Sequence, residues 1–248
     1  MSVLYGIHAV LEILRAEPSR IERVTVQRGL YGPRLQEAID LARQQQVPLS
    51  FEERAWLDRK SGGSRHQGII CQVGEAPTLT VEELLQQAVP PGLVLLLDGI
   101  EDPQNLGAIL RSAEVARVDG VVLPQRRSAG LTASVIKTSA GAASHLKVAR
   151  ISSLNRAIEI LKDSGYWVTG LAGESEKRIW EVDFSVPSAL VVGREGSGLH
   201  RLVREKCDLV VSIPARGRVT SYNVSVAAGI ALYEAIRQRA GKSPASLR

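Results

Sequence analysis

The chain has 248 residues, of which 44% are hydrophobic, 23% charged and 4% aromatic, the composition of a folded protein with an aliphatic core. These values exclude a disordered chain, a collagen and a disulfide scaffold. With 31 Lys and Arg against 26 Asp and Glu, the net charge is +5 and the pI is about 9.4, which moderately favours a polyanionic partner. At roughly 150 residues per domain, the length allows one large domain or two unequal ones, and we expect two.

The two cysteines and the N-terminus bear on the cellular location. Cys71 and Cys207 belong to no CxxC pair, which fits a reducing compartment and argues against a zinc or redox motif. The stretch MSVLYGIHAVLEILR lacks the pattern of a secretory signal, and the longest aliphatic run, Leu93 to Leu97, is too short to span a bilayer. We therefore expect a cytoplasmic protein without a membrane anchor.

The first 75 residues alternate between helical and strand periodicity. The predicted helices span 8–17, 34–46 and 53–62, and the predicted strands span 23–27, 48–52 and 68–73. This alternation is typical of a small α/β domain, which we place at residues 1–75. Residues 74–79 break the periodicity, and a short helix at 81–88 and a turn at 90–92 follow, so we assign 76–91 to a linker with a short helix.

Residues 92–248 form the expected second domain, in which short aliphatic runs recur between helical segments. The predicted strands span 93–98, 120–124, 144–149, 167–172, 189–193 and 209–214. Runs that are apolar throughout are typical of parallel strands buried on both faces. A final helix is predicted at 223–239, and the tail from 241 to 248 is expected to be loose. The fold class is therefore α/β, with a parallel sheet preceded by a smaller α/β domain.

The segment 95–117 joins the first strand of this sheet to a helix. Asp102 at the N-cap and Pro103 at the first helical position predict where the helix begins. Asn105 then lies in the first turn, where free N–H groups favour a polar or anionic ligand, and Arg111 follows on the same helix. A capping amide and a solvated arginine would explain either residue taken alone.

The segment 190–199 (LVVGREGSGL) ends a strand with three glycines that bracket one carboxylate, Glu195. Glycines allow a tight turn and a close approach of the backbone to a ligand. The pattern is neither GxGxxG nor GxxxxGK[ST], so the dinucleotide and P-loop interpretations lack their fingerprints. A structural turn without a ligand remains open.

The segment 212–229 runs from the end of a strand into the final helix. Arg216 and Arg218 lie in the loop, and Ser221 and Asn223 lead into the helix. Serine and asparagine are ordinary helix caps, but arginines beside a helix N-terminus are typical of a phosphate contact.

Metal chemistry and a serine nucleophile find no support in the sequence. The four histidines, His8, His66, His145 and His200, show neither HExxH nor CxxC…HxxxH spacing. No G-x-S-x-G elbow is present. We expect no metal site.

Taken together, residues 98–111, 192–199 and 213–225 resemble, in order and spacing, the three motifs of the SpoU (TrmH) branch of the SPOUT methyltransferases. The motifs YGIHAV, near the N-terminus, and HQGI, at 66–69, are similar to the L30e-like RNA-binding domain of members that 2′-O-methylate a guanosine in the peptidyl-transferase region of 23S rRNA. The resemblance spans nearly the full chain. Three ordered motifs with a matching accessory domain are far more specific than any one motif.

The resemblance implies S-adenosylmethionine (AdoMet) as methyl donor, 23S rRNA as partner, and a homodimer whose subunits share the active site. It also implies a C-terminal trefoil knot in a SPOUT-type sheet, whereas periodicity and ordinary topology rules alone would give an unknotted sheet.

The family's functional positions can be carried over by motif. The implied catalytic residues are Asn105, Arg111, Glu195, Ser221 and Asn223. The implied donor-binding residues are Gly170, Leu190, Gly193, Ile213, Tyr222 and Asn223. The expected RNA contacts are Arg216, Arg218, His66 and Gln67. Many relatives have leucine where this chain has Tyr222, a change that could alter donor affinity.

Arginine is a poor general base, because its pKa lies above 12. We therefore expect Arg111 to contact the target phosphate and to stabilise the developing 2′-oxyanion, while Glu195, a substrate phosphate or water takes the proton. Two alternatives remain open: a tRNA ribose 2′-O-methyltransferase of the same branch, and a non-catalytic RNA-binding ribosome assembly factor.

Overall fold

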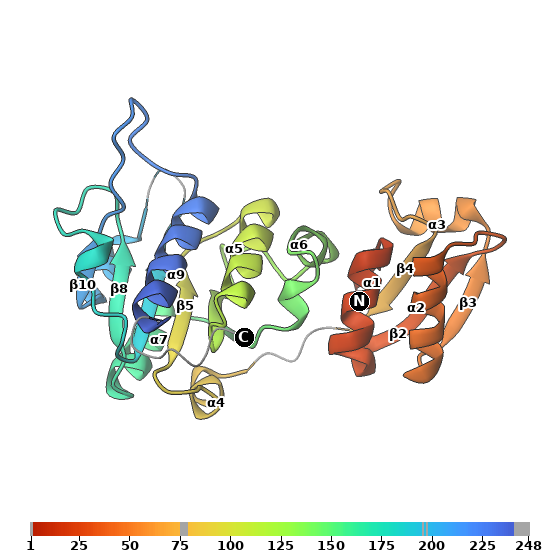
Figure 1. Cartoon of the computed structure of the whole chain (residues 1–248), viewed down its shortest axis with the longest axis horizontal. Coiled ribbons are helices and arrows are strands. Elements are labelled where there is room, and N and C mark those ends of the chain that lie inside the picture. The colour runs from red at the N-terminus through yellow and green to blue at the C-terminus, as the bar shows by residue number, and fades with distance from the viewer. Residues whose placement is uncertain (1, 75–78, 195, 197, 241–248) are drawn as a thin grey trace. The chain divides into compact units, whose positions relative to one another are not determined.

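The computed structural model describes residues 2–74, 79–194, 196 and 198–240, which divide into two compact units (Figure 1). Unit 1 contains the described residues up to 74 together with 130–145, and unit 2 contains 79–129 and the described residues from 146 onward. The expected second domain, 92–248, thus includes a segment that the structure packs into unit 1. The expected loose tail, 241–248, lies outside the described residues.

Unit 1 is built on a four-stranded mixed sheet with the order β1-β4-β2-β3. The strands are β1 (Ser2–Tyr5), β2 (Ile21–Gln27), β3 (Leu49–Glu52) and β4 (Ile69–Val73). Strands β1 and β2 run antiparallel to β4, and β3 runs parallel to β2. The helices are α1 (Ile7–Ala16), α2 (Pro33–Gln44) and α3 (Arg54–Lys60). The small α/β unit is confirmed, and β1 is a strand that the sequence periodicity missed.

Residues 130–145 complete unit 1. They form helix α6 (Ala133–Thr138) and a 3₁₀ turn (Ala142–Ser144). The ammonium of Lys137 lies 4.6 Å from the ring centroid of Tyr5 in β1, and Nε2 of His145 lies 3.0 Å from a carboxylate oxygen of Glu12 in α1. The chain therefore returns to unit 1 after the first two strands of unit 2.

Unit 2 contains a six-stranded sheet with the order β10-β8-β9-β5-β6-β7, in which every pairing is parallel. The strands are β5 (Leu93–Leu97), β6 (Gly120–Pro124), β7 (Val148–Ile151), β8 (Trp167–Leu171), β9 (Ser188–Val192) and β10 (Leu209–Val211). The predicted parallel sheet is confirmed. Strand β7 begins four residues later than predicted, because residues 142–144 form the 3₁₀ turn of unit 1.

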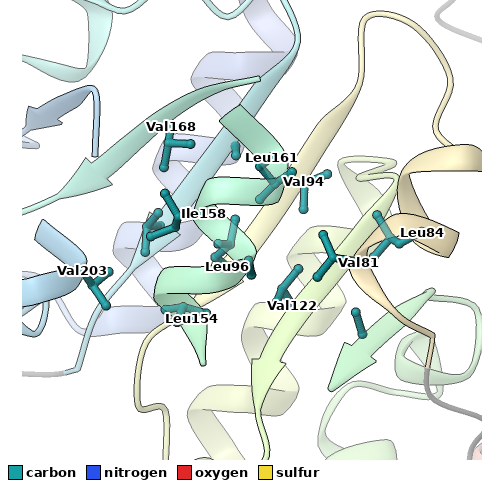
Figure 2. Close-up of a cluster of buried hydrophobic side chains, with 14 residues drawn as sticks. Val81, Leu84, Val94, Leu96, Val122, Leu154, Ile158, Leu161, Val168 and Val203 are labelled. Atoms are coloured by element: carbon teal, nitrogen blue, oxygen red, sulfur yellow. The ribbon is translucent and has the colours of Figure 1, made fainter. Parts of the chain in front are cut away.

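Helices cover both faces of this sheet. They are α4 (Val81–Gln86), α5 (Pro103–Val115), α7 (Leu154–Asp163), α8 (Arg201–Lys206) and α9 (Val224–Ala240). Figure 2 shows Leu154, Ile158 and Leu161 of α7 pointing at Val94 and Leu96 of β5, within a buried cluster that also includes α4 and α8. Alternate residues of β5 point to the other face. There α5 and α9 lie side by side (Figure 1).

Because all six strands run in one direction, their carboxyl ends lie along one edge of the sheet, the usual position of ligand sites in α/β folds. The segments singled out in the sequence follow β5, β9 and β10 at this edge. The trefoil knot remains a prediction.

Candidate active site

A cavity of about 450 Å³ lies at the carboxyl ends of β8, β9 and β10 in unit 2. This volume is within the range of small-molecule sites. Its lining residues are Leu171, Ala172, Gly173, Glu174, Val192, Gly193, Arg194, Gly196, Gly198, Ile213, Thr220, Ser221, Tyr222, Val224 and Ala227. Two of the three segments proposed from the sequence to carry a ligand, 190–199 and 212–229, thus line one cavity, whereas no residue of the segment 95–117 is among its lining residues.

The glycine loop after β9 forms one wall of this cavity. Arg194 and Gly198 exchange two backbone hydrogen bonds of 3.0 Å, which close a tight turn. A Cβ on Gly193 would lie 2.3 Å from the carbonyl carbon of Gly198 and 2.5 Å from the amide nitrogen of Leu199. Any side chain at position 193 would therefore collide with backbone. Glu195 lies outside the described residues.

A buried carboxylate that was not among the predicted site residues ties this loop to the end of β5. Asp98 is 4% exposed. Its Oδ2 accepts a 2.7 Å hydrogen bond from the backbone N–H of His200, and its Oδ1 lies 2.7 Å from Nδ1 of the same histidine. Gly99 follows with φ 78°, and a Cβ there would lie 2.9 Å from Cδ of Arg194. An Asp-Gly pair directly after a buried strand is the sequence signal that could have identified this support.

The N-termini of α5 and α9 are joined by two asparagines. Asp102 caps α5 by accepting hydrogen bonds from the backbone N–H of residues 104 and 105, as predicted. The amide nitrogen of Asn223 donates a 3.0 Å hydrogen bond to Oδ1 of Asn105, and Oδ1 of Asn223 accepts from the N–H and hydroxyl of Ser225. Two capped helix ends are thereby held next to each other, and the positive ends of their dipoles favour an anionic group in front of them.

Arg111 lies on α5 two turns beyond this pair and is exposed. Among the described residues it has no hydrogen-bond or ion-pair partner. Its guanidinium is therefore available for a ligand.

The predicted donor-binding residues divide into two groups. Gly193, Ile213 and Tyr222, together with the predicted catalytic Ser221, line the cavity, whereas Gly170, Leu190 and Asn223 are not among its lining residues. Leu190 is fully buried within β9. A Cβ on Gly170 would lie 2.6 Å from Cδ1 of Leu199 and 3.0 Å from Sγ of Cys207, so the missing side chain of Gly170 makes room for the glycine loop.

Further cavity residues were not anticipated from the sequence. Glu174 follows β8 and forms an ion pair with Arg204 of α8, and Thr220 precedes Ser221 in the loop that leads to α9. The hydroxyl of Tyr222 donates a 3.0 Å hydrogen bond to the carbonyl of Pro214, which closes this loop upon itself. No pattern in the sequence distinguishes Glu174 and Thr220 from ordinary loop residues.

The four expected RNA contacts lie in different surroundings. Arg216 and Arg218 are exposed in the loop between β10 and α9. His66 is only 5% exposed, because its Nδ1 accepts from the N–H of Gly68 at 3.0 Å and its Nε2 donates to Asp58 at 2.9 Å.

Gln67 is exposed, and its side-chain oxygen accepts a hydrogen bond from the N–H of Ile7 at the start of α1. Both side chains thus also hold a turn of unit 1 in place.

No group of three or more His, Cys, Asp and Glu residues within the described ranges is arranged to hold a metal ion. In the same part of the chain, no helix is both long and apolar enough to cross a membrane.

Comparisons with known proteins identify the class to which this fold and site belong. The model of the SpoU rRNA methylase family matches residues 92–233, and that of an RNA 2′-O ribose methyltransferase substrate-binding domain matches residues 3–79. The chain belongs to the SpoU rRNA methylase family, a family of methyltransferases.

Two relatives and one solved structure illustrate the similarity. The 23S rRNA (guanosine-2′-O-)-methyltransferases RlmB of Pseudomonas putida and Escherichia coli K12 are both 41% identical to this chain. The matches cover 95% and 96% of this chain and 96% and 98% of the relatives, respectively. The structure of the SpoU methyltransferase AviRb from Streptomyces viridochromogenes in complex with AdoMet has a TM-score of 0.82 at 23% identity, covering 96% of this chain and 90% of AviRb. That likeness supports the fold.

Proposed function

We propose that this chain transfers a methyl group from AdoMet to the 2′-hydroxyl of a guanosine ribose in 23S rRNA. The observation that carries the proposal is the cavity at the carboxyl edge of the sheet, next to the pair formed by Asn105 and Asn223. The chain that forms this cavity matches curated 23S rRNA guanosine methyltransferases over nearly their whole length.

The cavity fits the proposed donor. Its walls combine apolar side chains, such as Leu171, Val192 and Ile213, with glycine backbone and the hydroxyls of Thr220 and Ser221. Apolar walls suit a purine ring, and exposed backbone groups can hydrogen-bond its edge. AdoMet, when bound, supplies an electrophilic methyl group. The chain's task is then to orient the ribose and to manage the charge on its 2′-oxygen.

The described residues suggest how the target nucleotide is held. The Asn105 and Asn223 hydrogen bond fixes two helix N-termini side by side, and the positive ends of the two helix dipoles favour a phosphate in front of them. Arg111 adds a planar cation that can contact the same phosphate and stabilise negative charge on the ribose oxygen. Because its pKa lies above 12, Arg111 holds its proton, and the acceptor is Glu195, a substrate phosphate or water.

The proposal is tested by incubating the purified chain with labelled AdoMet and unmodified 23S rRNA fragments or tRNA, and by locating 2′-O-methyl groups by mass spectrometry. We expect a methylguanosine in the peptidyl-transferase region of 23S rRNA. Methylation of tRNA alone would keep the chemistry and overturn the substrate. Transfer to neither RNA, with no donor binding, would favour a non-catalytic RNA-binding protein.

Unit 1 is proposed to bind the RNA substrate, supported by the match of residues 3–79 to a substrate-binding domain. Deleting residues 1–75 is a poor test, because α6 and the following turn would lose the surface against which they pack. Gln67→Ala is a milder test: we expect weaker binding of an rRNA fragment with unchanged AdoMet affinity. Unchanged rRNA affinity would remove Gln67 from the interface.

We also propose that the chain acts as a homodimer in the cytoplasm. A shallow hollow between α5 and α9 is lined by small and apolar residues, among them Val226 and Tyr233, which are 49% and 65% exposed. Apolar patches of this kind often mark subunit interfaces. Sedimentation of wild type and Tyr233→Glu tests the dimer: a monomeric wild type would refute it, and a dimeric Tyr233→Glu variant would place the interface elsewhere.

A further inference from the structure

The carboxyl edge of the sheet continues past the cavity to the ends of β6 and β7, which no proposed role uses. In the sheet order, β5, β6 and β7 follow β9 in succession. At about 4.8 Å per strand, the end of β7 lies roughly 14 Å from the end of β9. This distance is within the reach of the nucleotides that flank a target bound at the cavity.

The loop after β6 carries two exposed arginines, Arg126 and Arg127. Neither has a hydrogen-bond or ion-pair partner in the described part of the chain. Arg127 has a φ of 54°, an uncommon conformation for a residue with a side chain, which costs free energy and is often found at functional sites. The N–H of Ala129 donates a 2.8 Å hydrogen bond to the carbonyl of Ile100, so this loop is fastened to the turn that leads into Asn105.

The end of β7 adds two more arginines around a second cavity of about 340 Å³. Arg150 donates from Nη2 to the carbonyl of Gln125 at 3.4 Å, which ties the end of β7 to the end of β6. Arg156 lies in the first turn of α7, which Ser153 caps, and its side chain is 68% exposed. The helix N-terminus and both guanidinium groups therefore border the same hollow.

Acidic groups do not cancel this charge. Glu159 lies 3.4 Å from a guanidinium nitrogen of Arg156 but also 2.6 Å from the ammonium of Lys206, so it is shared between two cations. Glu82 is the carboxylate among the lining residues of the cavity. Glu101 is exposed in the turn to which the loop after β6 is fastened. Four arginines against these two carboxylates leave the edge positively charged.

We propose that Arg126, Arg127, Arg150 and Arg156 form an arginine track that binds the phosphates of the RNA strand flanking the methylated nucleotide. Arginine presents a planar fork of donors that matches phosphate oxygens, and such contacts fix position without reading sequence. The inference rests on the proposed function, because it requires an RNA strand that enters the active site.

The test variant is Arg126→Gln with Arg127→Gln, since both side chains are exposed and their loss breaks no contact with a described residue. The charge-matched control is Arg117→Gln with Lys147→Gln, which removes two positive charges near the starts of β6 and β7, at the opposite edge of the sheet. It also removes the 3.1 Å hydrogen bond from Lys147 to the carbonyl of Gln87, so thermal unfolding is measured for both variants. Binding of a 23S rRNA fragment is measured between about 50 and 200 mM salt, together with KM, kcat and AdoMet affinity.

Each phosphate contact contributes about 0.7 to 0.9 to the slope of log affinity against log salt, so two lost contacts lower it by about 1.4 to 1.8. When the salt concentration rises fourfold, the wild type should therefore lose about 7 to 12 times more of its RNA affinity than the variant does. We expect a higher KM for RNA, with kcat and AdoMet affinity unchanged. Arg126→Lys with Arg127→Lys should restore most of the affinity, because lysine still offers a point charge.

An unchanged salt dependence and KM in the glutamine variant, or the same loss in the control, would overturn the arginine track while leaving the proposed function intact. A wild-type chain that binds AdoMet but methylates no RNA would instead overturn the proposed function. A fall in kcat alone would assign the two arginines to the chemical step and likewise refute the track.

Discussion

Gly193→Ala tests whether the closely packed glycine loop forms the donor site. The new Cβ would lie 2.3 Å from the carbonyl carbon of Gly198, whereas ordinary contacts begin at 3.4 Å. The backbone around Gly198 must therefore move by about 1 Å, and such overpacking costs about 1–3 kcal/mol. The φ of Gly193 is not in the left-handed region, so steric collision is the only effect of the methyl group.

A 1 Å displacement of a binding loop costs about 10²-fold in activity by misplacing the reacting groups. We expect AdoMet affinity, measured by calorimetry, to fall by at least tenfold while the chain remains folded. Gly217→Ala is the control, because a Cβ there comes no closer than 3.8 Å to its neighbours and also lies outside the left-handed region. Full AdoMet affinity in Gly193→Ala would refute the assignment of the donor to this loop.

Three further predictions follow from single contacts. Asp98→Ala removes the acceptor for both hydrogen bonds of His200. We expect the free energy of unfolding, measured with urea, to fall by about 3 kcal/mol and AdoMet affinity to fall as well. An unchanged free energy of unfolding would argue against this role of Asp98. Arg111→Lys should lower kcat about 10²-fold without changing AdoMet affinity, and nearly full activity would exclude a bidentate guanidinium role. Burial raises the pKa of the Cys71 and Cys207 thiols from 9.0 to about 12. At pH 8 the thiolate fraction therefore drops from about 10⁻¹ to about 10⁻⁴, and a thiol reagent should label the chain only after unfolding. Rapid labelling of the native chain would contradict this prediction.

Much of the fold follows from local patterning. The strands of unit 2 are apolar throughout, and this pattern alone indicates a parallel sheet buried on both faces, as observed. Strand β1 escaped prediction because its four residues have too little periodicity and gain their stability from pairing with β4, some 65 to 70 residues away. The return of residues 130–145 to unit 1 is equally non-local, since it depends on contacts such as Lys137 with Tyr5.

The site shows the same division between local and non-local information. Helix capping is local, so the start of α5 at Asp102 and Pro103 could be predicted. The hydrogen bond between Asn105 and Asn223 joins residues 118 positions apart, and only family resemblance suggested that they share a site. Asp98 belongs to the first motif, yet its structural task became visible only through its contact with His200.

Residues named by a motif can act on a ligand directly or through the backbone that they hold. In unit 1, both ring nitrogens of His66 are engaged with Asp58 and Gly68, and Gln67 binds the N-terminus of α1. Loss of either side chain would therefore loosen a turn as well as remove a surface group. In unit 2, Arg126 and Arg127 are exposed and have no partner among the described residues, so a loss of RNA affinity on their replacement reports directly on phosphate binding. The arginine track is for this reason a cleaner test of RNA binding than the motif residues of unit 1.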